Sequence, residues 1–206
     1  MIPVVNRRAA VPGSTRGGDR AKTDRSILFG APMVRAILAG VKTQTRRVIR
    51  WPEWIIDREA AAYRLQTSPG LALYVDGRLC RTFTCPYGQP GDRLWVRETF
   101  CERSGDLLYR ADGKFEQPRY CVAFEGEDRW RPSIHMPRWA SRLDLPVVST
   151  RVERLRAISE ADARAEGVTS VAEYAVFWDS INGKRPGCSW DDSPWVWCVE
   201  FASVAR

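Results

Sequence analysis

Short segments in which hydrophobic and polar positions alternate recur along this chain, and this pattern predicts β-strands. In the last segment Trp195, Trp197 and Val199 fall on one face, as expected for a strand packed against a core. A further hairpin is predicted over residues 73–80, where an Asp-Gly pair separates apolar positions. The predicted strands are residues 26–29, 48–51, 93–100, 107–110, 120–124, 143–155 and 195–201.

Helical periodicity is confined to three segments. Residues 32–39 place Pro32 in the first turn of a predicted helix, where its missing N–H is tolerated. A second helix is predicted from Ser159, a good N-cap with Asp162 three residues later, to Gly167. Residues 171–181 repeat apolar side chains at helical spacing and predict a third helix.

Many short strands with two or three helices predict an α+β fold around a small β-barrel. Residues 1–25 are rich in Arg, Gly and Pro and predict a disordered basic tail. Residues 26–206 then form a single domain, with inserts near 52–84 and 100–129 and an irregular chain in much of the first insert. The sequence has no βαβ alternation, dinucleotide fingerprint or P-loop, so it gives no support to those nucleotide-binding classes.

Composition narrows the class of protein. The 206 residues include 44% hydrophobic residues and nine Trp, as in a folded globular protein, and no apolar run could span a bilayer. No apolar segment follows Arg7 and Arg8, so we expect no secretory signal and a cytoplasmic location.

The cysteines and histidine give no sign of a metal site. The chain has six Cys without a C-x-x-C pair and a single His, so we expect neither a metal ion nor a cofactor. Cys80 and Cys85 are interpreted as reduced thiols, a redox or metal role being the alternative.

The net charge of +7 is unevenly distributed. Residues 35–50 hold five Lys or Arg and no acid, and residues 129–156 hold seven Arg against two acids. If these two basic segments meet in space, they could hold a phosphate or a polyanion. If they lie apart, they are two solvated surfaces.

Two further patterns carry candidate chemistry. In an extended chain Lys42, Gln44 and Arg46 share one face, and a Lys near Thr45 could assist deprotonation of its hydroxyl; a solvated basic loop is the alternative. Residues 130–142 interleave Trp with Arg around the only His, a composition that could stack on a base or could plug one end of a barrel. Glu98 shares a strand face with two apolar residues, which places its carboxylate at the end of the core or beside a cavity.

Several of these stretches together resemble the ASCH domain, a family of PUA-like β-barrels. The resemblance covers residues 26–206, and within the family this chain is similar to the longer ASCH-like proteins of tailed phages and prophages. It is carried by Ile27-Leu28-Phe29, by residues 33–47 with their Gly-Val-Lys-Thr-Gln-Thr-Arg-Arg core, by Pro90-Gly91-Asp92 and the strand that follows, by residues 130–142 and 158–167, and by the closing strand 195–201.

The resemblance implies RNA binding or, in a small bacterial branch, hydrolysis of the N4-acyl amide of N4-acetylcytidine. Its catalytic Lys, Thr and Glu match Lys42, Thr45 and Glu166, with Glu160 and Asp162 as rivals for the Glu. In this interpretation Thr45 attacks the acyl carbon, Lys42 takes its proton, and Glu166 protonates the leaving amine.

We expect the substrate or nucleic acid to be bound by a further set of residues: Arg46, Arg47, Glu98, His135, Arg138 and Trp139. The expected partner is a modified pyrimidine nucleoside or a nucleic acid, RNA being favoured over DNA. A non-catalytic nucleic-acid-binding module and a metal-independent ribonuclease are the alternative functions. At the residue level the alternatives are a structural ion pair for Lys42 and Glu166, a plain strand position for Thr45, and a buried Arg partner for Glu98.

Overall fold

The computed structural model describes residues 22–67, 70–75, 78–103, 105–113 and 129–202. Most of the predicted tail, the turn of the 73–80 hairpin and the predicted strand 120–124 lie outside these residues. The first strand begins at Asp24, inside the segment assigned to the tail.

The strands are β1 (Asp24–Leu28), β2 (Gln44–Val48), β3 (Leu71–Val75), β4 (Arg78–Phe83), β5 (Arg93–Arg97), β6 (Phe100–Arg103), β7 (Asp106–Tyr109), β8 (Asp144–Arg154) and β9 (Trp195–Phe201). The α-helices are α1 (Ala31–Leu38), α2 (Arg58–Thr67), α3 (Glu160–Ala165) and α4 (Val171–Asn182). Short 3-10 turns are η1 (Arg110–Asp112), η3 (Ser133–His135), η4 (Arg138–Ala140) and η5 (Leu155–Ala157).

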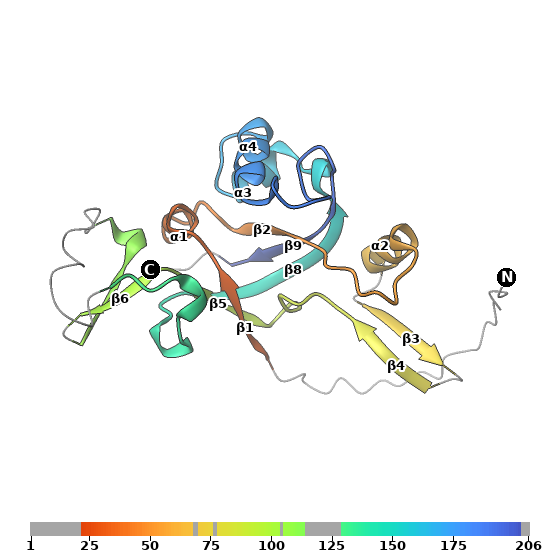
Figure 1. Ribbon diagram of the computed structural model, residues 1–206, viewed down its shortest axis with the longest axis horizontal. Helices are drawn as coiled ribbons and strands as arrows, with labels where there is room; N and C mark the ends of the chain where they lie inside the picture. The colour runs from red at the N-terminus through yellow and green to blue at the C-terminus, as the bar shows by residue number, and fades with distance from the viewer. Residues whose placement is uncertain (1–21, 68–69, 76–77, 104, 114–128, 203–206) are drawn as a thin grey trace.

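Five strands form the central sheet in the order β1-β5-β8-β9-β2 (Figure 1). β1 pairs in parallel with β5, and the other neighbours in this sheet are antiparallel. The eleven-residue strand β8 pairs with β5 through Asp144, Leu145 and Pro146 and with β9 from Val147 onward. Since Pro146 has no N–H to donate, it suits the point where β8 changes partner.

The predicted β-barrel is wrong: within the described residues the sheet is open, with β1 and β2 as its two edges. A barrel would need a backbone ladder to close these edges. Instead the Arg47 guanidinium of β2 reaches across and donates to the Leu28 carbonyl of β1 at 2.6 Å. A long side chain therefore occupies the position where closing backbone hydrogen bonds would form.

Local sequence features explain where the helices beside the sheet begin and which residues they bury. α1 carries Pro32 in its first turn and buries Val34 and Ile37. α3 begins with a reciprocal capping box between Ser159 and Asp162, which confirms the predicted start of that helix. α3 and α4 lie together over β2 and β9 (Figure 1), and Tyr174 and Trp178 of α4 are buried in the core beneath them.

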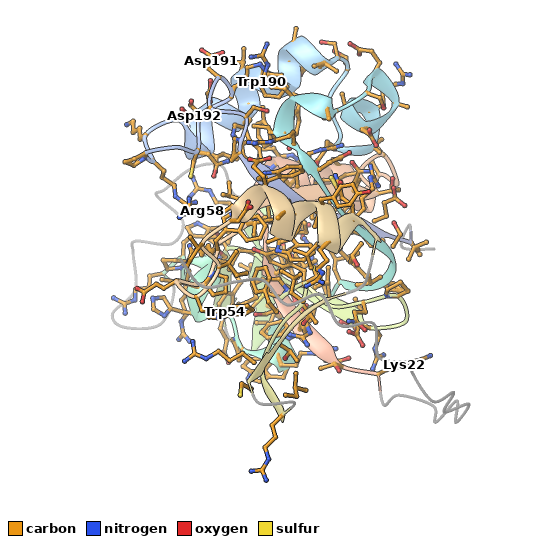
Figure 2. The ribbon with its side chains drawn as sticks, turned by 90° about the vertical axis from the view of Figure 1, so that its right-hand side faces the viewer. Lys22, Trp54, Arg58, Trp190, Asp191 and Asp192 are labelled. Atoms are coloured by element: carbon orange, nitrogen blue, oxygen red, sulfur yellow. The ribbon has the colours of Figure 1, made fainter. Side chains whose placement is uncertain are left out.

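The first predicted insert contains α2 in addition to the β3–β4 hairpin, and α2 was not predicted. Figure 2 shows α2 crossing in front of the sheet, with Arg58 at the helix and Trp190 above it on the α4 side. α2 buries Ala61, Ala62 and Leu65 in the main core and adds polar contacts to the sheet. Gln66 donates to the Val152 carbonyl at 3.0 Å, and Glu59 pairs with Arg154. Its buried face is only two alanines and one leucine among charged residues, which is too weak an apolar stripe to predict the helix from periodicity.

Two findings bear on the predicted class of protein. Of the helices in the described ranges, none has the length and apolar character needed to cross a membrane. The five cysteines in those ranges, among them Cys80 and Cys85, are free thiols, and no group of three His, Cys, Asp or Glu side chains in those ranges could hold a metal ion.

Candidate functional site

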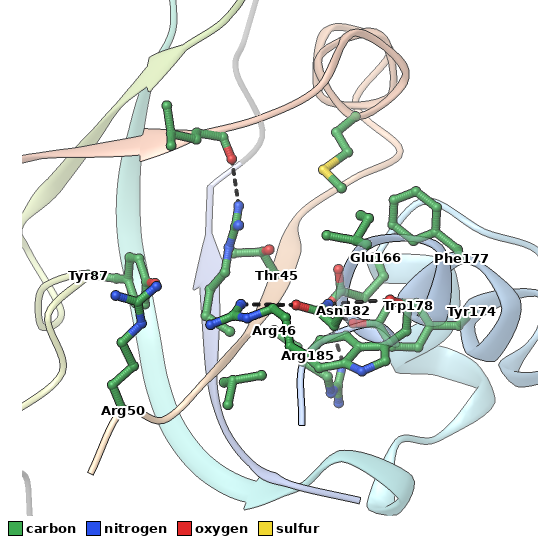
Figure 3. A pocket seen from close by; sticks show the side chains of 15 residues that line it. Thr45, Arg46, Arg50, Tyr87, Glu166, Tyr174, Phe177, Trp178, Asn182 and Arg185 are labelled. Carbon is green, nitrogen blue, oxygen red and sulfur yellow. Dashed lines mark hydrogen bonds and ion pairs between the residues drawn. The ribbon is translucent and has the colours of Figure 1, made fainter. Parts of the chain in front are cut away.

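A small cavity of about 230 Å³ lies between the β2 edge of the sheet and α4 (Figure 3). One wall comes from β2 and the chain after it, and the other comes from α4 and the end of α3. The residues that line it are Leu28, Met33, Thr45, Arg46, Arg47, Val48, Arg50, Tyr87, Glu166, Tyr174, Phe177, Trp178, Ile181, Asn182 and Arg185.

Gly167 allows the end of α3 to approach the chain that enters β2. Its φ of +91° favours glycine, and a Cβ there would lie 3.2 Å from the Ala36 Cβ and 3.4 Å from the Lys42 Cβ. The approach is fastened by the Thr43 N–H, which donates to the Ala165 carbonyl at 2.8 Å. Glu166 lies between Ala165 and Gly167 in the sequence and is thereby held against Lys42.

Lys42 is almost completely buried, with a relative exposure of 1%. Its Nζ donates to Glu166 Oε2 at 2.6 Å, to the Glu166 carbonyl at 2.9 Å and to the Gln44 carbonyl at 2.7 Å. Burial lowers the pKa of Lys42 from its ordinary value of 10.5, and this effect outweighs the opposing influence of the Glu166 charge. Lys42 is therefore easier to deprotonate than an exposed lysine.

Glu166 joins Lys42 to the cavity. Its Oε2 accepts from Lys42, whereas its Oε1 accepts from the Tyr174 hydroxyl at 3.4 Å and from Arg46 Nη1 at 3.5 Å. Lys42 itself does not line the cavity, but Glu166 does. Burial and the Glu166 charge raise the pKa of Tyr174, so its hydroxyl stays protonated and remains a donor to Glu166.

Arg46 is buried and bound by carboxylates from two other elements. Its Nη2 lies 2.6 Å from Glu153 Oε1 of β8 and 3.3 Å from Asp162 Oδ2 of α3. Burial would raise the pKa of Asp162, but hydrogen bonds from Gln44 and Ser159 and the Arg46 charge lower it. The paired Arg46 fixes the strand beside the cavity and neutralises the acids behind it.

Thr45 is 3% exposed and lines the same cavity as Glu166. In Figure 3 its hydroxyl lies above Arg46, on the side of the cavity that faces α4. The structure thus brings the three predicted catalytic residues to one place: Thr45 and Glu166 at the cavity, and Lys42 behind Glu166. Neither rival lines the cavity: Glu160 is exposed and accepts from the Val171 N–H, and Asp162 caps α3 and pairs with Arg46.

Of the six predicted binding residues, only Arg46 and Arg47 line the cavity. Glu98 is buried and receives Arg142 through two hydrogen bonds of 2.9 and 3.0 Å, the structural alternative considered for it. Arg138 pairs with Asp144 at 2.8 Å, His135 is exposed, and Trp139 is 67% exposed. Residues 130–142 therefore neither reach the cavity nor plug a barrel with Trp139.

Sequence reasoning missed the residues that α4 and its flanking loops contribute. Tyr174, Phe177 and Trp178 repeat at helical spacing, which predicts a helix but no cavity, and all three line the cavity. Arg50 and Arg185 also line it, from beyond the ends of β2 and α4. That these segments share a cavity is visible only in the folded structure, where residues of β2 and α4 line the same cavity.

Comparison with known proteins does not identify a family. No protein-family model matches the sequence, and no curated protein matches it. A crystal structure of protein EF3133 from Enterococcus faecalis V583, described by the family model DUF984, aligns over 90% of this chain and 82% of its own length. The two are 11% identical with a TM-score of 0.40, a likeness too distant to assign a fold or a function.

Proposed function

We propose that this protein is an amidohydrolase of the ASCH type, which removes an acyl group from the N4 amine of a modified cytosine nucleoside or base. The observation that carries the proposal is the buried Lys42–Glu166 pair, 2.6 Å apart, behind a cavity that Thr45 and Glu166 line. Because the sheet is open, the proposal rests on this site and the residues that resemble the ASCH motif, not on a barrel fold.

The proposed chemistry uses all three residues of this arrangement. Thr45 attacks the acyl carbon, and its hydroxyl proton passes to the Lys42–Glu166 pair. The same pair returns a proton to the exocyclic nitrogen as the amide bond breaks, so the deacylated cytosine leaves as a neutral amine. Water then hydrolyses the acyl-threonine and releases the carboxylic acid. Glu166 is suited to relay these protons since it touches both Lys42 and the cavity.

The cavity also suits a single planar base. Phe177 and Trp178 offer aromatic surface, and Asn182 offers an amide that already accepts from Arg185 at 3.5 Å. Aromatic faces stack on any base, whereas amide groups can read its hydrogen-bonding edge. A cavity of about 230 Å³ has room for one small group and not for a stretch of duplex.

A purely structural role for the pair is the competing explanation. Buried ion pairs gain little net stability over an apolar replacement, because both charges lose their hydration. A lysine with a lowered pKa beside a carboxylate at a cavity is typical of a functional site. This reasoning favours the catalytic role for Lys42.

The ion pairs of the second basic segment disfavour the non-catalytic binding module. Four of its arginines are engaged with carboxylates, so their charge is compensated within the protein: Arg138, Arg142, Arg151 and Arg154. Compensated arginines release few counterions when a polyanion binds. A wide nucleic-acid surface is for this reason the weaker proposal.

The proposed location is the cytoplasm. The five cysteines in the described ranges are free thiols, and free thiols persist in that compartment.

The decisive experiment incubates the purified full chain with N4-acetylcytidine and a panel of N4-acyl cytosines, followed by chromatography. We expect deacylated product with the wild type and a loss of at least about a hundredfold with Lys42→Ala. Circular dichroism of the variant checks that it folds. An absence of product from every substrate would overturn the proposal.

A further inference from the structure

Of the four arginines that line the cavity, two have neither a carboxylate partner nor a hydrogen bond to a backbone carbonyl within the described residues. Arg46 is bound by Glu153 and Asp162, and Arg47 donates to the Leu28 carbonyl. Arg50 and Arg185, by contrast, form no ion pair within the described part of the chain. Among the described residues, the guanidinium of Arg185 makes one long contact, 3.5 Å to Asn182 Oδ1.

The cavity wall therefore carries uncompensated positive charge. Glu166 is the single carboxylate among its lining residues, and Lys42 and Arg46 already hold it. Arg151 of β8, by contrast, is matched with Glu153, Asp162 and Glu200. A concave site with an excess of one charge attracts a ligand of the opposite charge.

Arg50 and Arg185 approach from different walls. Arg50 follows β2 and lies beside Tyr87, whereas Arg185 follows α4 (Figure 3). Both side chains are exposed, so their guanidinium groups are free to turn toward a ligand at the mouth of the cavity. Two guanidinium groups that flank an anion are a strong arrangement for phosphate, since each donates charge-assisted hydrogen bonds.

We propose that the site takes its cytosine in phosphorylated form, with the base in the cavity and the phosphate bound between Arg50 and Arg185. The proposal rests on the function argued above, and it specifies the substrate as a nucleotide in place of a nucleoside. The phosphate has two conceivable sources, a free mononucleotide and the backbone of a nucleic-acid strand, and the experiment separates them.

The first test measures binding without catalysis. Calorimetric titration of the full chain with cytidine and with cytidine 5′-monophosphate should show the nucleotide bound about tenfold or more tightly. The preference should disappear in Arg50→Gln/Arg185→Gln and persist in Arg58→Gln, which removes one exposed charge on α2 outside the cavity. Equal affinities in the wild type, or a preference that survives the double variant, would overturn the phosphate subsite.

A trinucleotide with a central cytidine identifies the phosphate source. Tighter binding than the mononucleotide, lost in the same double variant, assigns the subsite to a nucleic-acid strand, and weaker binding assigns it to a free nucleotide. Turnover of N4-acetylcytidine and its 5′-monophosphate then separates the two proposals. Phosphate-dependent binding without amide cleavage removes the amidohydrolase and keeps the subsite, whereas cleavage with equal kcat/KM for both substrates removes the subsite alone.

Discussion

At the scale of single residues, the site is organised around one amine with unusual surroundings. Lys42 is almost wholly buried, yet its Nζ donates three hydrogen bonds to oxygen atoms, one of which belongs to the Glu166 carboxylate. Its position four residues before Arg46 and next to a glycine-bounded turn could be read from the sequence. Its burial and its contact with a carboxylate 124 positions away could not, since spacing along the chain does not measure distance across the fold.

The pH dependence of catalysis should follow the Lys42–Glu166 pair. The base form of Lys42 is the neutral amine, so kcat/KM for an N4-acyl cytosine should rise with pH along its acid limb. Because burial lowers the pKa of Lys42, the midpoint of that limb should lie below 10.5. A pH profile with no rise, or with its midpoint at or above the ordinary value, would exclude Lys42 as the base.

The same pair makes a prediction about stability. Lys42→Met keeps the volume but leaves Glu166 with only its longer contacts to Tyr174 and Arg46, so it should cost about 3–5 kcal/mol of unfolding free energy. Adding Glu166→Gln removes the stranded charge and should restore part of the loss. Urea unfolding monitored by tryptophan fluorescence measures both variants. A cost below about 1 kcal/mol for Lys42→Met would mean that the pair is not buried as described.

At the scale of elements, Gly167 allows the end of α3 to pack closely against the chain that enters β2. Gly167→Ala would strain a backbone at φ +91° and press a Cβ against Ala36 and Lys42. We expect a loss of roughly 1–2 kcal/mol from the backbone, further loss from the contact, and a fall in kcat as Glu166 shifts.

Gly91→Ala is the matched control for this substitution. Gly91 has nearly the same φ, +92°, but a Cβ there would meet no atom within 4 Å. It should show the backbone cost without the effect on kcat. If both variants lower kcat equally, the close approach at Gly167 does not position Glu166.

Elements with local signals could be predicted, and those without could not. The Ser159 and Asp162 capping box fixed the start of α3, and the Pro-containing first turn marked α1. The buried face of α2 is only Ala61, Ala62 and Leu65 among charged residues, so its apolar periodicity is too weak to predict a helix before it packs on β8. The cavity-lining face of α4 was visible as a helical face, but its partner across the cavity was not.

At the scale of the whole molecule, the order of strands was beyond prediction because it depends on long-range pairing. β1 pairs with β5, sixty-nine positions away along the chain at Asp24 and Arg93, and β2 pairs with the last strand β9. Alternating segments predict that strands exist but do not specify their neighbours. The barrel was therefore inferred from the number of short strands and helices and from the resemblance to the ASCH domain, and an open sheet satisfies the same pattern of strands.

An open sheet should show unequal protection from hydrogen exchange. The strands β8 and β9 lie inside the sheet, whereas β1 and β2 are its edges with one backbone neighbour each. We expect the amides of residues 196–199 to exchange slowest and those of β1 fastest among these strands, as measured by mass spectrometry or NMR. Equal protection of β1, β2 and β9 would indicate a closed ladder and contradict the observed topology.

The central claim is that Thr45, at the cavity with Glu166, performs acyl transfer from an N4-acyl cytosine. The most direct measurement compares the rate of N4-acetylcytidine hydrolysis by the wild type, Thr45→Ala and Thr43→Ala. Thr43 is a neighbouring threonine that does not line the cavity. The account predicts product with the wild type and Thr43→Ala and a loss of at least about a hundredfold with Thr45→Ala. Equal rates for Thr45→Ala and the wild type would contradict it.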